Sequence, residues 1–236
     1  KMIAGAYCAY ARDRVSLANL RAVPGIAPDK IQYAPDLAFN FRVGCASEDA
    51  RSIPGFESST QGPATIGICP NMVIYREACS PGQGRNNPYL CWLVSLCKAL
   101  LEETDAQLVL LPHELRTWRR DDLFLCRLVR SSVASHDRVH LVGSRASADT
   151  LKVLIGKLSF LVGSRYHSIV AAISQGVPAV AIGYSHKYAE LMKDANVDEL
   201  AFSYHDMNGD AVISEVVRAW NRRHDIRERL SESVPR

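Results

Sequence analysis

Arg165 and His167 place a guanidinium and an imidazole within three residues, where an apolar run gives way to a helical pattern. The stretch reads LVGSRYHSIVAAISQ, so both side chains stand at the start of a helix whose remainder is apolar. A helix N-terminus offers free N–H groups and the positive end of the helix dipole, which favour an anion. Arginine matches a carboxylate or phosphate, and histidine transfers protons near neutral pH. The pair therefore predicts an anion site with acid–base chemistry.

Polar residues also follow the other apolar runs of this part of the chain. They are Asn71, His113, Arg145, and the group Tyr184, His186 and Lys187. The carboxyl ends of parallel strands share one edge of a sheet, so we expect these side chains to gather there. The edge would be rich in cations and hydrogen-bond donors and poor in carboxylates, which suits an anionic ligand.

Each candidate also has a structural interpretation. Arg165 could pair with a nearby acid, and His167 could be a hydrogen-bonded histidine of the helix start. For His113 and Lys187 the two interpretations are balanced, whereas Arg145 is more typical of a structural residue.

The elements that would position these residues alternate regularly. Short apolar runs are followed by helical patterns, the second of which opens on Asp121-Asp122 as an acidic first turn. The runs cover 64–69, 106–111, 138–143, 158–163 and 178–183, and the helices 87–103, 120–135, 146–157, 166–175 and 210–233. This order predicts βαβ units and a parallel sheet covered on both faces.

The first part of the chain has a different pattern. Residues 1–63 hold short apolar pieces and end in a stretch rich in Ser, Gly and Pro, near 46–63, that is typical of a linker or surface loop. We predict that 1–63 is the tail of a truncated N-terminal Rossmann-like α/β domain with its linker. Residues 64–236 would form a complete C-terminal Rossmann-like domain.

Composition narrows the class of protein. The 28 basic and 25 acidic residues give a net charge of +3, too small to favour nucleic acid. The seven cysteines form no CxxC pair, which favours reduced thiols and a cytoplasmic location, with the inner face of the membrane as a second option. No apolar run reaches the roughly 20 residues that span a bilayer. The sequence has no HExxH, GxGxxG or GxxxxGK[ST] motif, and we predict neither a metal nor a cofactor.

Residues 163–187, GSRYHSIVAAISQGVPAVAIGYSHK, resemble the signature region of the polysaccharide pyruvyl transferase family. ARDRVS, YAPDLAF and LLPHELRTWRRDD resemble further family elements in the same order, and the last is a Pro-His segment followed by an Asp. The resemblance runs from about Arg12 to Asn196, and Leu37 stands where proline is common in the family.

The resemblance implies a GT-B-like architecture, in which two Rossmann-like domains enclose the active site. The implied reaction moves pyruvate from phosphoenolpyruvate to hydroxyls of a sugar as a ketal, and the acceptor can be lipid-linked. Arg165 and Arg12 would hold the donor's carboxylate and phosphate, with help from Lys187. His167 would act in acid–base catalysis or donor binding.

Four more residues complete the predicted site. His113 is a candidate second proton-handling group, Asp36 a candidate acceptor contact, and Asn71 and Tyr184 candidate substrate-binding residues. Two other functions share this pattern: a GT-B glycosyltransferase with a nucleotide-sugar donor, and a non-catalytic anion-binding protein. For the first, Glu190 is the candidate partner of the donor ribose.

Overall fold

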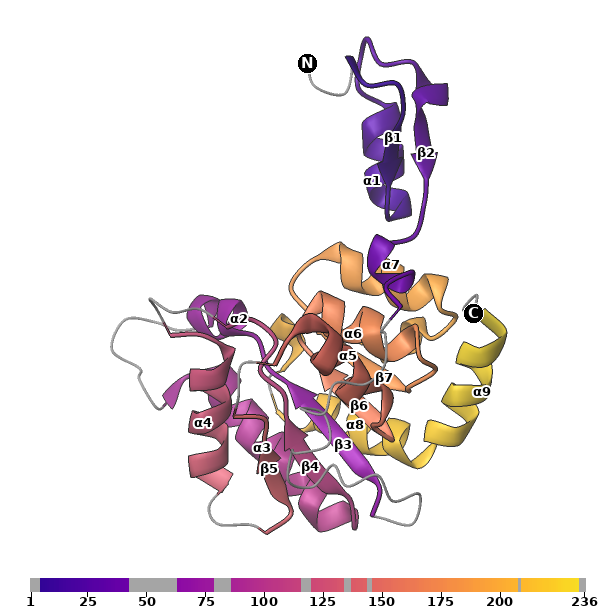
Figure 1. The fold of residues 1–236 in the computed structure, drawn as a ribbon. Helices are drawn as coiled ribbons and strands as arrows, with labels where there is room; N and C mark the ends of the chain where they lie inside the picture. Colours follow the sequence, from indigo (N-terminus) through magenta and orange to yellow (C-terminus); the bar gives the residue numbers. More distant parts are fainter. Residues whose placement is uncertain are drawn as a thin grey trace.

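The computed structural model describes residues 5–42, 63–78, 86–115, 120–133, 137–143, 146–207 and 209–233. The described residues form two separate parallel sheets, one of six strands and one of two (Figure 1). The larger sheet lies between layers of helices, and the smaller one stands apart from it, next to α7 (His186–Asp194).

The larger sheet contains the five predicted strands and one more. Its strands are β3 (Thr65–Cys69), β4 (Gln107–Leu110), β5 (Val139–Leu141), β6 (Phe160–Gly163), β7 (Ala179–Gly183) and β8 (Ala201–Ser203). The short β8 was not predicted, because three residues after a 3-10 turn give no periodicity to detect. It pairs in parallel with β7 and forms one edge of the sheet.

The strand order is β5-β4-β3-β6-β7-β8. The chain therefore winds outward from β3 to β5, crosses the sheet, and winds outward again from β6 to β8. This is the Rossmann arrangement, in which ligands bind outside the carboxyl ends of the strands where the order reverses. Here that place lies between β3 and β6, whose last residues Cys69 and Gly163 are paired neighbours.

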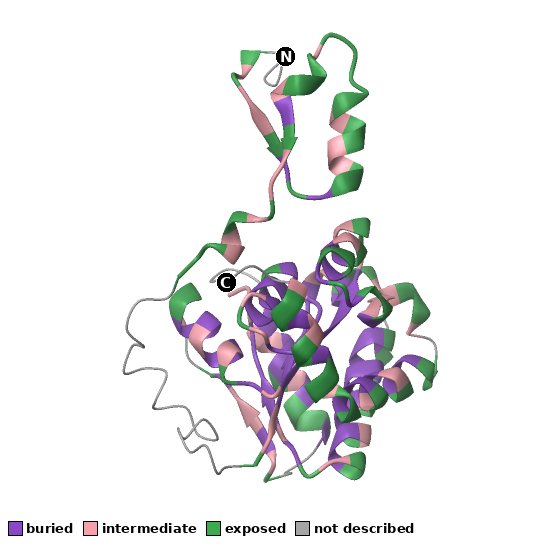
Figure 2. Cartoon of the chain, turned by 90° about the vertical axis from the view of Figure 1, so that its right-hand side faces the viewer, coloured by how far each residue is buried: buried purple, intermediate pink, exposed green. Residues whose placement is uncertain are grey.

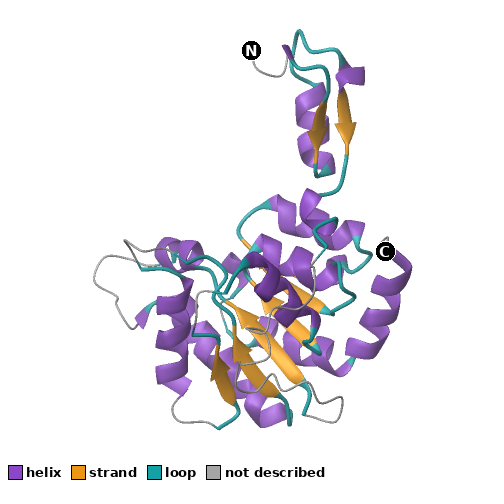
Figure 3. Ribbon diagram, viewed as in Figure 1, coloured by secondary structure: helices purple, strands orange, loops and turns teal. Residues whose placement is uncertain are grey.

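Helices cover both faces of this sheet, as predicted (Figure 3). α3 packs against α4 and α8 on one face, and α5 packs against α6 on the other. Their bounds are α3 (Pro88–Glu103), α4 (Asp122–Val133), α5 (Ala148–Gly156), α6 (Tyr166–Ile173), α8 (Ala211–Asn221) and α9 (Arg223–Ser233). The core between the layers is apolar, and every residue of β6 and β7 is buried (Figure 2).

Two helix predictions need correction. The predicted single helix over 210–233 is two helices, because the chain leaves the helical path at Arg222 and α9 then buries Ile226 and Leu230 against the core. The six-residue α2 (Met72–Glu77) was not predicted either. Asn71 caps it by accepting a hydrogen bond from the Val73 N–H at 2.8 Å.

The small sheet pairs β1 (Ala9–Ala11) in parallel with β2 (Ile31–Tyr33), and α1 (Arg14–Arg21) connects them. This unit contacts α7 through polar groups. The Tyr33 hydroxyl donates to Asp194 at 2.7 Å, and the Arg14 N–H donates to Glu190 at 3.2 Å. The division at residue 63 stays a prediction, and the linker predicted near 46–63 lies almost wholly outside the described residues.

Candidate active site

A cavity of about 290 Å³ lies at the carboxyl ends of β3, β4, β6 and β7, beside the turn that follows β1. Its lining includes seven of the eight predicted site residues, from five separate segments of the chain. The lining residues are Arg12, Asn71, His113, Glu114, Arg165, Tyr166, His167, Tyr184, Lys187 and Tyr188. Asp36, the eighth, contacts two of them.

The start of α6 is set close against the end of β6 by Gly163. A Cβ at this position would lie 2.9 Å from Cγ1 of Ile169 and 3.0 Å from Oγ of Ser168. The glycine therefore lets the helix begin directly beyond the strand. Arg165 is the N-cap, and Ser168 donates a hydrogen bond to its carbonyl oxygen at 2.7 Å.

Arg165 is held by two carboxylates. Its Nε and Nη2 donate to Asp122 at 2.8 and 2.7 Å, and its Nη1 lies 2.5 Å from Oε2 of Glu114. The side chain of Arg165 is 15% exposed. The structure thus shows that Arg165 pairs with acids, the structural interpretation that the sequence left open. Of its two acid partners, Glu114, which binds Nη1, lines the cavity.

Asp122 is a residue whose importance the sequence did not reveal. It is the first residue of α4, as predicted, but its carboxylate is fully buried rather than solvated. Besides Arg165 it accepts hydrogen bonds from the backbone N–H groups of Met72 at 2.9 Å and Glu114 at 2.8 Å. It therefore joins the loops after β3, β4 and β6. The available signal was the Asp that follows the Pro-His segment in the family resemblance.

Asp36 joins Arg12 to His167. Its Oδ2 lies 2.8 Å from Nη1 of Arg12 and 3.8 Å from Nε2 of His167, which is 56% exposed. Partial burial disfavours the charged carboxylate, but the Ala38 N–H, Arg12 and His167 outweigh it and lower the pKa of Asp36. Arg12 also stacks over the Tyr166 ring at 4.7 Å, which brings the small unit to the cavity.

Lys187 lies among three tyrosines. Its Nζ is 5.3 Å from the ring centre of Tyr166, 5.2 Å from that of Tyr184 and 5.6 Å from that of Tyr188. Cation–π attraction of this kind holds an ammonium without neutralising it. Lys187 forms no ion pair with any residue that the structure describes, so its charge is available to a ligand.

His113 is largely neutral at neutral pH. Burial, followed by the positive charges of Arg165 and His167, lowers its pKa to about 4, and Glu114 opposes this only in part. A neutral imidazole accepts a proton or a hydrogen bond, so His113 can act as a base. It can act as an acid only after it has taken a proton from a bound substrate.

Asn71 lines the cavity, but its side chain is occupied within the protein. It is buried, accepts from Val73, and donates its Nδ2–H to the Ser164 carbonyl at 2.8 Å. Tyr188 donates to the same carbonyl at 3.0 Å. These bonds connect the loop after β3 to the loop after β6.

The expectation of few carboxylates holds for the lining of the cavity, where Glu114 is the one acid among the described residues. Its two arginines are nevertheless paired with acids, Arg12 with Asp36 and Arg165 with both Glu114 and Asp122, and of these acids Asp36 and Asp122 do not line the cavity. Asp36 is 24 residues from Arg12 in the sequence and Asp122 is 43 residues from Arg165, so no local pattern predicted these pairs.

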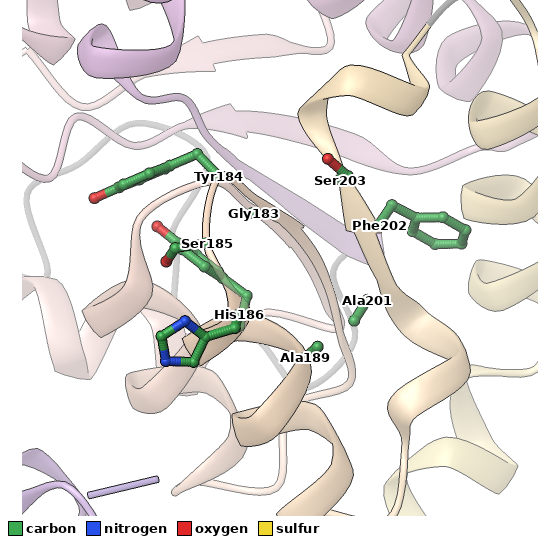
Figure 4. Close-up of a pocket in the computed structure, with 9 residues that line it drawn as sticks. Gly183, Tyr184, Ser185, His186, Ala189, Ala201, Phe202 and Ser203 are labelled. Carbon is green, nitrogen blue, oxygen red and sulfur yellow. The ribbon is translucent and has the colours of Figure 1, made fainter. Parts of the chain in front are cut away.

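A second hollow of about 340 Å³ adjoins the cavity and shares Tyr184 and Tyr188 with it. Figure 4 shows the two segments that line this hollow, with Ser185, His186 and Ala189 on the β7–α7 segment and Ala201, Phe202 and Ser203 on β8. Nε2 of His186 lies 3.5 Å from Asp13 of the small unit. The hollow thus combines hydroxyl groups with apolar side chains, and none of the described residues that line it carries a carboxylate.

Some predictions and findings concern only part of the chain. Arg145 lies outside the described residues. Within the described ranges, no three or more His, Cys, Asp or Glu side chains are grouped so that they could hold a metal ion. None of the described helices is long and apolar enough to cross a membrane.

Known proteins resemble this chain in sequence and in fold. The amylovoran biosynthesis protein AmsJ of Erwinia amylovora is 25% identical over 118 residues, which cover 50% of this chain and 28% of that protein. A putative UDP-N-acetylglucosamine 2-epimerase from Listeria monocytogenes superposes with a TM-score of 0.64 at 12% identity, over 97% of this chain and 55% of that one. The glycosyltransferase SnogD from Streptomyces nogalater superposes with a TM-score of 0.46 at 15% identity, over 97% of this chain and 53% of that one.

These findings settle fold and family. The similarity to the epimerase and the six-stranded parallel sheet confirm the predicted α/β, GT-B-like, Rossmann-like architecture. The chain spans about a quarter of AmsJ and about half of each of the two solved structures. The family model for polysaccharide pyruvyl transferase matches residues 2–186, and the chain therefore belongs to the polysaccharide pyruvyl transferase family.

Proposed function

We propose that this chain supplies the donor-binding site of an enzyme that moves pyruvate from phosphoenolpyruvate to a sugar of a polysaccharide or its precursor, as a ketal. The observation that carries the proposal is the cavity at the topological switch point, where Arg12, Arg165, Lys187, His113 and His167 converge. Family membership supports the reaction class.

The cations suit a donor with a carboxylate and a phosphate. Lys187 has no acidic partner among the described residues, and Arg12 is 41% exposed and held by a single carboxylate contact. Arg165 is fixed by Asp122 and offers Nη1. Three cations in a partly enclosed site can hold both anionic groups and stabilise the phosphate as it leaves.

The two histidines suit the proton transfers of ketal formation. The methylene carbon of the donor must gain a proton, and each attacking sugar hydroxyl must lose one as its oxygen bonds to the central carbon and phosphate departs. His167 lines the cavity, is 56% exposed and lies 3.8 Å from Asp36, so we assign it the donation. Neutral His113 is the candidate base.

The adjoining hollow is a candidate place for the acceptor sugar. Its volume of about 340 Å³, its hydroxyl groups and the absence of carboxylates in its lining suit a neutral polyhydroxylated ring. Tyr184 and Tyr188 form the wall between the hollow and the cavity, so a sugar bound there would lie next to the donor. Asp36 remains the candidate for a direct contact to the acceptor.

The proposal is tested by supplying the full-length protein with phosphoenolpyruvate and saccharide acceptors, and separately with nucleotide-sugars. We expect phosphate release that depends on both phosphoenolpyruvate and acceptor. Nucleotide release without any turnover of phosphoenolpyruvate would show a glycosyltransferase instead. The structure gives that alternative little support, because Glu190 accepts a hydrogen bond from the Arg14 backbone.

A further inference from the structure

Glu114 and Asp122 bind Arg165 in different ways. Asp122 is fully buried and holds Nε and Nη2 while it also accepts two backbone hydrogen bonds, so it cannot leave without opening three loops. Glu114 holds only Nη1, at 2.5 Å, and its side chain is 28% exposed and lines the cavity. One carboxylate is therefore a fixed part of the fold, and the other lies at the surface of the site.

We propose that Glu114 competes with the donor: its carboxylate occupies, in the empty site, the position on Arg165 that an anionic group of the donor takes on binding. This inference rests on the proposed function, because it describes how the same cavity accepts the donor. It adds that binding requires the exchange of an internal carboxylate for an external one.

The exchange follows from charge and geometry. The two arginines of the cavity are paired with carboxylates, so an entering anion finds Arg165 already neutralised. Two carboxylates crowded on one guanidinium nitrogen repel each other strongly in a partly desolvated site. The anion therefore binds through Nη1 only when the Glu114 side chain moves away from that nitrogen.

The local structure allows this movement. The Glu114 N–H donates to the buried Asp122 at 2.8 Å, which anchors the backbone of the loop, whereas the side chain is 28% exposed at the cavity. Lys187 carries a charge without an acidic partner among the described residues, and it lines the same cavity. It can hold the anion while Glu114 withdraws from Arg165.

The test uses the full-length protein and its Glu114→Gln variant, with inorganic phosphate and phosphoenolpyruvate as probes in isothermal titration calorimetry. Glutamine keeps the shape of the side chain and removes the competing charge. We expect both anions to bind about threefold more tightly to E114Q, a gain that shrinks at high salt. Glu215→Gln on α8 makes the same change in net charge at a residue paired with Arg218 outside the cavity, and should leave both affinities unchanged.

The outcomes separate this inference from the proposed function. Unchanged binding of both anions by E114Q, confirmed with folded Glu114→Ala, overturns the competition, and weaker binding overturns it and shows instead that Glu114 assists binding. Failure of the wild type and both variants to bind either anion overturns it as well. Tighter binding by E114Q in a protein that transfers no pyruvate supports the competition and counts against the proposed function alone.

Discussion

The two arginines of the cavity differ in the freedom that their acid partners leave them. Asp122 grips Arg165 through two nitrogens and is fully buried, so Arg165 is a fixed reference point of the site. Asp36 contacts Arg12 through one nitrogen, and the Arg12 side chain is 41% exposed. At the scale of single residues, the site therefore combines one rigid cation, one adjustable cation and the ammonium of Lys187.

Replacing the buried carboxylate should destabilise the fold. Asp122→Asn leaves Arg165 and two backbone N–H groups with a weaker acceptor in a buried place, and we expect a loss of about 3 kcal/mol in the free energy of unfolding. Urea denaturation measures it. Asp149→Asn, an exposed residue of the first turn of α5, is the matched control and should lose less than about 0.5 kcal/mol. Equal losses would refute the role given to Asp122.

Removing the candidate acid should affect turnover far more than folding. In the full-length protein, His167→Ala is expected to lower kcat about 100-fold, because the proton for the donor methylene loses its source. Its stability should change little, since the side chain is 56% exposed. His224→Ala, on the exposed face of α9, serves as control and should keep full activity. Wild-type turnover in H167A would remove His167 from the mechanism.

His113 predicts a pH dependence of stability with a definite sign. Its pKa is about 4 in the folded protein against 6.5 for an ordinary histidine, so the unfolded chain takes up the proton first. Stability should therefore fall as pH is lowered from about 6.5 to 4, by an amount on the order of 2 kcal/mol. Asp36, whose pKa is lowered from 3.8, loses its stabilising contribution only below that window.

The comparison of His113→Gln with the wild type isolates this effect. Thermal denaturation between pH 6.5 and 4 should show a flatter decline in the variant. His140, whose pKa burial also lowers, is present in both proteins and does not affect their difference. Parallel curves for the two proteins would mean that His113 is not desolvated as described.

At the scale of elements, the site depends on how closely helices begin beyond strands. A Cβ on Gly183, the last residue of β7, would lie 2.6 Å from Cγ of Tyr188, so the absence of a side chain at Gly183 leaves room for that ring. Tyr188 in turn donates to the Ser164 carbonyl and stands beside Lys187. The β7–α7 junction thus supports both the cation and the β6–α6 loop.

Gly183→Ala should therefore displace the Tyr188 ring and, through it, disturb the site. We expect a loss of about 1–3 kcal/mol in the free energy of unfolding, typical of overpacking, together with weaker binding of phosphate. The control is Gly143→Ala after β5, because a Cβ there meets no atom of the described residues within 4 Å. Denaturation and phosphate titration of the two variants provide the comparison, and equal behaviour would contradict the packing role of Gly183.

At the scale of the whole molecule, the strand order places the cavity. Reversal between β3 and β6 leaves a gap at their carboxyl ends, and the small sheet sets Arg12 beside it through contacts with α7 and Tyr166. The cavity is therefore lined by residues that follow strands of both sheets. Movement of the two-stranded sheet relative to α7 would change the position of Arg12 in the cavity and leave the position of Arg165 unchanged.

The strands and most of the cavity residues could be predicted from the sequence because they follow from local patterns, whereas contacts between distant loops could not. Apolar runs such as 158–163 and 178–183 reveal buried strands, and the residues after the runs identify six of the residues that line the cavity, because strand ends share an edge. The pairing of Arg165 with Asp122 and Glu114 could not be read, since no local pattern reports contacts between loops. The break at Arg222 and the three-residue β8 were similarly too local and too short to detect.

The most direct test of the central claim is to incubate full-length protein with isotopically labelled phosphoenolpyruvate and a saccharide acceptor, and to analyse the saccharide by mass spectrometry and NMR. The proposed function predicts that all three labelled carbons of pyruvate appear on the sugar as a ketal, with release of phosphate. It also predicts that H167A transfers far less label. A saccharide that gains no label, or gains a sugar from a nucleotide-sugar instead, would contradict it.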